Sequence, residues 1–150
     1  TNQDGVVTNV HVSGGGICRD ASGQLLPGKI CSVKHPSGPV TWHTHPRANR
    51  PSSSDMRNSV VGANTHVIAT PLGVWAYRAT ADLVARWKTA TADERRRFKL
   101  DWRFMGHQHQ RGTQEGRVES FLTWARGAGF SMTYIPYSDV KRGAVWVLHL

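Results

Sequence analysis

The pattern of apolar and polar residues divides the chain into a strand-rich first half and a helical second half. In the first half, short alternating runs are separated by Gly, Pro and Ser, which is typical of strands joined by turns. Hydroxyls of the Ser52–Ser54 run can cap a short helix that continues to about Val61. Strands are predicted at residues 6–12, 29–34, 39–43, 65–70 and 74–78, with a hairpin turn at Pro71-Leu72-Gly73.

Three helices are predicted in the second half, each with one apolar face. Thr80 can cap the first, and Thr91 to Glu94 form a capping box that begins the second. Gly127 or Gly129 can end the third, and strands at 130–134 and 144–148 close the domain. The inward faces comprise Leu83, Val84 and Trp87, then Phe98, Trp102 and Met105, then Val118, Phe121, Leu122 and Ala125.

These elements predict a single domain of the α/β (α+β) class over residues 1–150. The chain has 150 residues, 39% of them hydrophobic, which is enough to bury a core. No apolar run reaches the roughly 18 residues of a membrane span, and no signal peptide opens the chain. The chain begins at Thr1 rather than Met, so we expect a processed protein or a piece of a larger one, and the sequence leaves its location open.

A strong basic excess bears on the partners of the domain. Nineteen Lys and Arg residues against ten Asp and Glu give a net charge of +9, which favours attraction to acidic partners. No nucleic-acid-binding motif accompanies this charge, so nucleic acid is not expected as a partner. The basic residues cluster at Arg86, Lys88, Arg95, Arg96, Arg97, Lys99 and Arg103, where interleaved Asp93, Glu94 and Asp101 indicate a solvated helix face.

The segment His43-Thr44-His45-Pro46 carries the chemistry of the chain. Residues two apart on a strand project to the same face, so the two imidazoles can bind one metal ion. Asp55, in the first turn of the following helix, can add a carboxylate oxygen. Two His, one Asp and an open fourth position are typical of catalytic zinc. His43, His45 and Asp55 are therefore the predicted Zn²⁺ ligands.

Other candidate metal sites in the sequence are weaker. His107-Gln108-His109 is a second HxH, but it lies in a Gly-bounded polar stretch without a suitably spaced carboxylate. Cys18 and Cys31 are not in a CxxC motif, so we do not expect a thiolate zinc site, and their redox state stays open. The isolated histidines are expected to be either hydrogen-bonded within the protein or exposed to solvent; they are His11, His35, His66 and His149.

His43-Thr44-His45-Pro46 followed by Ser52-Ser53-Ser54-Asp55 resembles the JAMM (MPN-type, JAB-like) zinc metallopeptidases. The resemblance covers roughly residues 1–80, the zinc-site half, and is weak over 81–150, the helical half. Six residues separate His45 from Ser52, a shorter loop than the family usually has. The resemblance implies a curved mixed β-sheet flanked by helices, with Zn²⁺ held by the residues named above. It also implies that Ser52 donates a hydrogen bond to the developing oxyanion.

The family's upstream Glu, which serves as general base, has no counterpart before His43. The first Glu of the chain is Glu94, and Gln3, before Asp4 and Gly5, occupies the position that the resemblance gives to the Glu. A Gln amide can hydrogen-bond water but cannot take its proton, so we expect impaired turnover. Three explanations stay open: an introduced Glu-to-Gln change at position 3, a natural pseudoenzyme, or Asp4 acting as the base.

The implied function is hydrolysis of a peptide or isopeptide bond by water that zinc activates. Small basic domains with this motif resemble effector or toxin modules of bacterial secretion systems, which implies a protein or peptide substrate and a cognate immunity or inhibitor protein. Two alternatives remain: a catalytically inactive JAMM-like interaction module, and a basic metal-dependent nuclease that uses the same histidines.

Overall fold

The computed structural model describes residues 22, 24, 38–45, 50–108 and 113–139, with only the backbone for 105–108. The chain divides into two compact units, Thr1–Thr41 and Trp42–Leu150. The elements given below belong to the second unit, apart from the first two residues of β1. Outside the described residues lie the predicted strands at 6–12, 29–34 and 144–148, and also Gln3, Asp4, Cys18 and Cys31.

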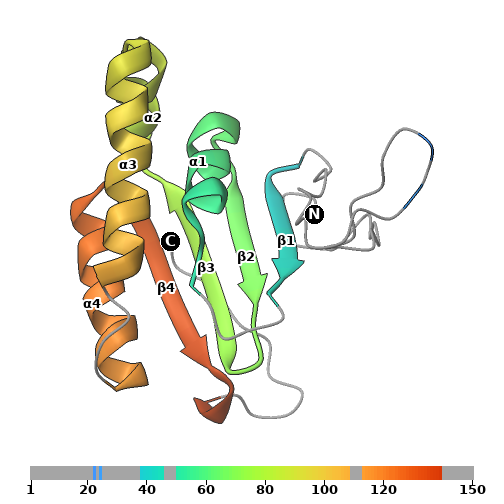
Figure 1. The fold of residues 1–150 in the computed structure, drawn as a ribbon. Coiled ribbons are helices and arrows are strands. Elements are labelled where there is room, and N and C mark those ends of the chain that lie inside the picture. The colour runs from blue at the N-terminus through green and yellow to red at the C-terminus, as the bar shows by residue number, and fades with distance from the viewer. Residues whose placement is uncertain (1–21, 23, 25–37, 46–49, 109–112, 140–150) are drawn as a thin grey trace. The chain divides into compact units, whose positions relative to one another are not determined.

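Each strand and helix predicted within the described residues is present, with ends shifted by a few residues. The last helix begins four residues before Val118, the first position of its predicted apolar face, because Thr113 caps it. In chain order the elements are β1 (Val40–Thr44), α1 (Ser53–Gly62), β2 (Thr65–Ala69), β3 (Gly73–Ala79), α2 (Ala81–Thr89), α3 (Ala92–Gln108), α4 (Gln114–Gly127), β4 (Phe130–Pro136) and a 3₁₀ turn (Tyr137–Asp139) (Figure 1).

The strands form one four-stranded sheet in the order β1-β2-β3-β4. β2, β3 and β4 pair antiparallel, whereas β1 runs in the same direction as β2, so the sheet is mixed (Figure 1). Parallel neighbours need a crossover connection, and α1 supplies it between β1 and β2. The described part of the chain is therefore an α+β arrangement, as predicted. Its JAMM-like character and the single domain over 1–150 stay predictions.

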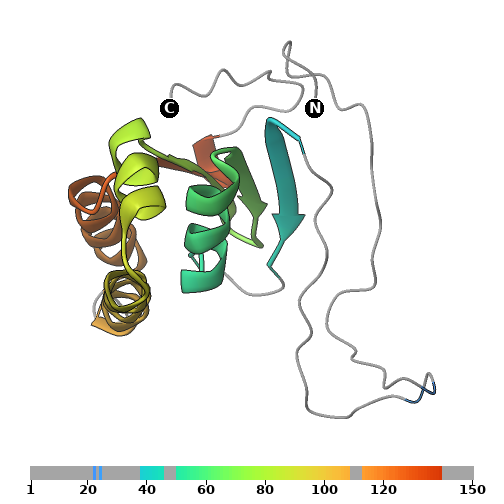
Figure 2. The ribbon, with the colours of Figure 1, turned by 90° about the horizontal axis from the view of Figure 1, so that it is seen from above.

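The helices pack on the sheet face that carries Ile68, Trp75 and Tyr77. Residues opposite one another in the antiparallel register point to one face, which places Met132 opposite Tyr77 and Ile68 opposite Trp75. In the view from above, α1 lies beside β1 and β2, and α2, α3 and α4 lie toward β4 (Figure 2). The apolar cluster consists of Met56, Val60, Ile68, Trp75, Tyr77, Leu83, Trp87, Trp102, Phe121, Leu122, Ala125, Phe130 and Met132.

Capping side chains begin the helices where the sequence predicts them. The Thr80 hydroxyl accepts a hydrogen bond from the Leu83 N–H at 3.3 Å. Thr91 and Glu94 form the predicted capping box, with the Thr91 N–H donating to the Glu94 carboxylate at 2.7 Å. Within the described residues, no helix combines the length and apolar character that a membrane span requires.

Candidate metal centre

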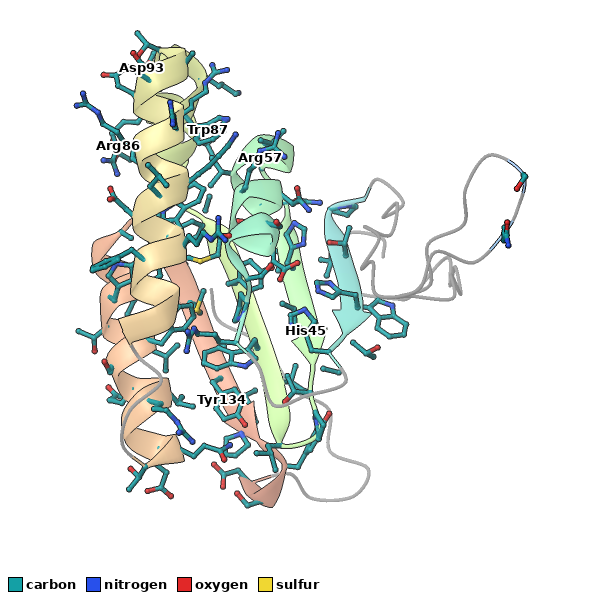
Figure 3. The ribbon with its side chains drawn as sticks, in the orientation of Figure 1. His45, Arg57, Arg86, Trp87, Asp93 and Tyr134 are labelled. Atoms are coloured by element: carbon teal, nitrogen blue, oxygen red, sulfur yellow. The ribbon has the colours of Figure 1, made fainter. Side chains whose placement is uncertain are left out.

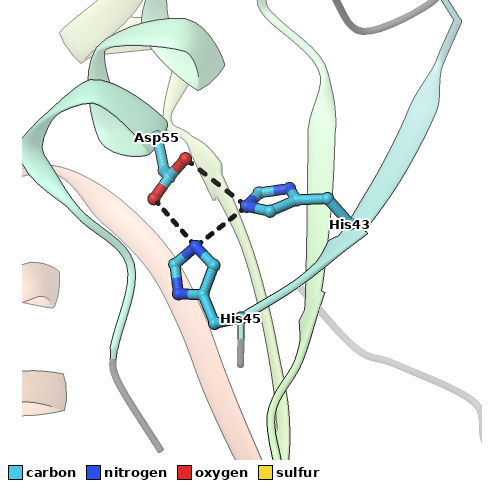
Figure 4. Close-up of side chains that lie close together, drawn as sticks. All are labelled: His43, His45 and Asp55. Atoms are coloured by element: carbon cyan, nitrogen blue, oxygen red, sulfur yellow. Dashed lines mark hydrogen bonds and ion pairs between the residues drawn. The ribbon is translucent and has the colours of Figure 1, made fainter. Parts of the chain in front are cut away.

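β1 and α1 bring the side chains of His43, His45 and Asp55 together. Strand alternation directs both imidazoles to the same side of β1, and Asp55 reaches them from the first turn of α1 (Figures 3 and 4). The β1 register is fixed next to the site, since the His45 N–H donates to the Ala69 carbonyl at 2.9 Å. The three residues predicted from sequence as metal ligands are thus one cluster.

The donor atoms of this cluster converge on a small volume. His43 Nε2 and His45 Nε2 are 3.1 Å apart. The carboxylate of Asp55 spans the pair, with Oδ1 3.4 Å from His43 Nε2 and Oδ2 3.5 Å from His45 Nε2 (Figure 4). The side chains are 19%, 20% and 13% exposed for His43, His45 and Asp55 respectively. The cluster is therefore sheltered by the fold but remains open to solvent.

These distances fit a tetrahedral zinc ion. Zinc binds imidazole nitrogen and carboxylate oxygen at about 2.0–2.1 Å, so two of its ligand atoms are about 3.3–3.4 Å apart. The three separations of 3.1, 3.4 and 3.5 Å lie close to that edge length. Two imidazoles with one carboxylate also suit first-row transition metals better than magnesium or calcium, which prefer oxygen ligands. The group can hold a metal ion and leaves a fourth position for another ligand.

A local hydrogen-bond network holds Asp55 in place. The Ser52 N–H and the Ser52 hydroxyl both donate to Asp55 Oδ2, at 2.8 and 2.6 Å. In return the Ser52 oxygen accepts from the Asp55 N–H at 3.2 Å, which completes a capping box at the start of α1. Ser52 is thus the helix N-cap, and it also orients a candidate metal ligand. The oxyanion role that the resemblance implies for Ser52 stays a prediction.

The same contacts keep the Asp55 carboxylate ionised. Burial by itself would raise the pKa of Asp55, but hydrogen bonds from the His43 side chain and from Ser52 lower that pKa to about 2. A carboxylate that is charged at neutral pH can bind a cation without first losing a proton. The electrostatics of the site therefore favour a metal ion.

Two buried residues on β2 and β3 contact each other, and one of them, Tyr77, lies near Asp55. His66 and Tyr77 are opposite one another in the register, and their rings stack with centroids 5.5 Å apart. The ring of His66 is hydrogen-bonded to Asn64 Oδ1 at 2.8 Å, so the prediction of a satisfied histidine is confirmed there. Tyr77 is fully buried, and both burial and the nearby Asp55 charge raise the pKa of its hydroxyl.

Tyr77 is the residue of this region that sequence reasoning missed. Its hydroxyl has no hydrogen-bond partner among the residues that the structure describes. Tyr77 belongs to the continuous buried run of β3, two residues after Trp75, and an apolar run of this kind predicts a core residue. Nothing local in the sequence indicates that the core position also lies beside Asp55, because β3 begins eighteen residues after it.

Other predicted site residues fall outside what the structure describes. Gln3 and His109 lie outside the described residues, and the His107 side chain is not described. Trp42, next to His43 in β1, projects from the opposite side of the strand and is 47% exposed.

Comparison with known proteins finds no relatives: no protein-family model, curated protein or solved structure matches this chain.

Proposed function

We propose that this chain is a zinc-dependent amide-bond hydrolase of the JAMM type, with turnover impaired by Gln3. The observation that carries the proposal is the convergence of two imidazole nitrogens and one carboxylate at tetrahedral ligand spacing. The chain order His-x-His followed by Asp at a capped helix start supports the same assignment. His43, His45 and Asp55 would hold the metal.

Each residue of the site has a distinct role in this proposal. Zinc, when bound, would lower the pKa of a water molecule toward neutrality and polarise the carbonyl of the scissile amide. His43 and His45 supply neutral nitrogen donors, and Asp55 adds a negative charge. Ser52 keeps the Asp55 carboxylate aimed at the histidines through its N–H and hydroxyl. In a substrate complex the Ser52 hydroxyl would turn to donate to the oxyanion.

In this proposal, Gln3 limits the rate of the reaction. The amide of Gln3 can orient a water molecule but cannot accept its proton or protonate the leaving amine. General acid–base catalysis contributes about 10²–10⁴-fold to such reactions, so slow turnover is expected in this chain.

Zinc content and peptidase activity test the proposal separately. Elemental mass spectrometry of the purified protein should find one zinc per chain, and His43→Ala should lose it. Gln3→Glu should then raise hydrolysis of denatured protein substrates by about 10²-fold or more. Absence of zinc, even after incubation with excess metal, would overturn the proposal. Metal-dependent cleavage of DNA or RNA that His45→Ala abolishes would favour a nuclease instead.

A second candidate, an inactive metal-binding interaction module, is favoured by the lack of any Glu before position 94. It predicts stoichiometric zinc but no gain of hydrolysis in Gln3→Glu. The double substitution Gln3→Glu with His43→Ala is the control, since any activity that survives loss of the ligand is unrelated to the metal centre.

A further inference from the structure

A basic groove lies between α1 and α3, formed by residues that the metal centre does not use. Its volume is about 320 Å³, which is in the range of small ligand-binding clefts. Helix α1 contributes Ser53, Ser54 and Arg57, and the other lining residues come from α3. From here on, "the basic groove" refers to the cavity lined by Ser53, Ser54, Arg57, Ala92, Arg96, Lys99, Leu100 and Arg103.

The cations of the basic groove follow one face of α3. The lining residues of α3 at positions i, i+3, i+4 and i+7 are Arg96, Lys99, Leu100 and Arg103. This spacing places them in a single row along the helix. Arg57, which is labelled on α1 in Figure 3, lines the same cavity. Four positive charges therefore surround one cavity.

These charges have no counter-charge in the part of the chain that the structure describes. None of the four takes part in an ion pair or hydrogen bond there. Arg86 differs, since it pairs with Asp82 at 3.0 Å. Arg97 lies outside the groove. Hydrogen bonds from Thr91 and, to a smaller extent, the charge of Arg97 lower the pKa of Glu94. Neighbouring cations with no anion raise the local potential and attract a negatively charged ligand.

The start of α1 adds further anion-binding groups to the basic groove. Ser53 and Ser54 are the first two residues of this helix, where backbone N–H groups have no acceptor within the helix. These N–H groups and the positive end of the helix dipole favour an oxyanion. The groove thus combines guanidinium, ammonium and hydroxyl donors.

We propose that the basic groove binds an acidic segment of a polypeptide that also carries an apolar side chain. Leu100 lies within the row of cations and is 55% exposed, so it offers an apolar contact between the charges. Arg96 and Arg103 are seven residues apart, which is about 10 Å along a helix, and an extended peptide covers that distance in about three residues. Two carboxylates that flank one apolar residue therefore match the groove.

The location of the groove gives it a role in the proposed hydrolase. Ser53 and Ser54 lie in the same first turn of α1 as Asp55, so the groove and the candidate metal centre share one end of that helix, on different sides of it. An acidic segment held there would deliver a neighbouring amide toward the metal centre. This role in substrate selection rests on the proposed function, whereas binding of an acidic segment to the basic groove does not depend on it.

Peptide binding, measured by fluorescence anisotropy at physiological ionic strength, tests the inference. The probe is a short fluorescein-labelled peptide of Glu and Asp residues with a central Leu, and its Gln/Asn counterpart is the uncharged control. We expect the acidic peptide to bind and the uncharged one not to bind. Arg96→Glu or Arg103→Glu should weaken binding by about tenfold or more, because each reverses a charge that lines the groove.

Arg97→Glu is the matched control, since it makes the same charge change one residue away and outside the groove. It should weaken binding much less than Arg96→Glu, because Arg97 does not line the groove and would act on the peptide only through solvent, where salt weakens its charge. Leu100→Ala should weaken binding of the peptide that contains Leu, but not binding of a peptide in which Gly replaces that Leu. Thermal unfolding of each variant would establish that these exposed substitutions leave the fold intact.

Three results would overturn the inference: equal losses in Arg96→Glu and Arg97→Glu, equal binding of the acidic and uncharged peptides, or tighter binding of a single-stranded oligonucleotide of the same charge. His45→Ala separates the two proposals. If that variant lacks zinc and still binds the acidic peptide, the groove is independent of the metal. If wild-type protein holds no zinc yet binds the peptide, the proposed hydrolase fails and the groove remains.

Discussion

The two sides of helix α1 use polar residues in opposite ways. On the side toward β1, Asp55 is matched with His43 and His45 at distances of 3.4 and 3.5 Å, and Ser52 holds it by further hydrogen bonds. On the side toward α3, the cations of the basic groove have no anionic partner in the described residues. A matched cluster supports chemistry that depends on precise geometry, whereas unmatched charges supply long-range attraction.

The largest expected effect is on zinc affinity, when a candidate metal ligand on the β1 side of α1 is removed. His45→Ala should weaken zinc binding by more than about a hundredfold, since even residues that only support metal ligands contribute about 10–100-fold. Thr44→Ala is the matched control, because Thr44 projects to the other side of β1 and should leave zinc affinity unchanged. Competition with a chromophoric chelator measures both affinities. Equal affinities in the two variants would contradict the assignment of the site.

Ser52 should have the next largest effect. Ser52→Ala removes a helix cap and the hydroxyl that fixes Asp55, so we expect zinc affinity to fall by about tenfold and the free energy of unfolding by about 1 kcal/mol. Thr113→Ala removes the N-cap of α4, a helix that begins far from the candidate metal ligands in sequence, and the Thr113 hydroxyl accepts its hydrogen bond from Gly116 of the same helix. It should lower stability by a similar amount with no change in zinc affinity. Chemical denaturation and chelator competition separate the two quantities.

The buried hydroxyl of Tyr77 should have a smaller effect, and of the opposite sign. With no hydrogen-bond partner for this hydroxyl in the described residues, Tyr77→Phe should leave the free energy of unfolding unchanged or raise it by up to about 1 kcal/mol. Tyr134→Phe is the control, because that hydroxyl is hydrogen-bonded to Gln114 and its loss should lower stability slightly. Urea denaturation of the metal-free proteins gives both values. A marked loss of stability in Tyr77→Phe would show that its hydroxyl is bonded.

The smallest expected effect concerns Glu94, at the start of the helix that carries the basic groove. Hydrogen bonds from the Thr91 N–H and hydroxyl lower the pKa of Glu94 below its usual value of 4.5 in this exposed position. A carboxyl whose pKa is lower in the folded state stabilises the fold above its unfolded pKa, and this contribution is lost as the pH falls through the folded pKa. Glu94→Gln should therefore be slightly less stable than wild type at neutral pH and equally stable in strong acid. Urea denaturation at several pH values would measure the difference, and a gap that persists in acid would contradict this origin.

Local patterns were sufficient to predict the described elements and the three side chains of the candidate metal centre. The alternation around His43 and His45, and the capping pattern from Ser52 to Asp55, each depend on residues a few positions apart. Such patterns are readable because strand and helix periods are fixed by the backbone. The interpretation of Arg96, Lys99 and Arg103 as a solvated face was right about exposure but did not include Arg57, which belongs to a different helix.

The sequence by itself therefore determined which residues of β1 share a face, where α1 begins, and which side chains can bind a metal. Only the tertiary structure decided that Asp55 meets both histidines, that Tyr77 lies beside it, and that Arg57 joins the cations of α3 around one cavity. The physical reason is that secondary structure sets spacing within a segment, whereas distances between segments depend on how the apolar faces of the helices pack on the sheet.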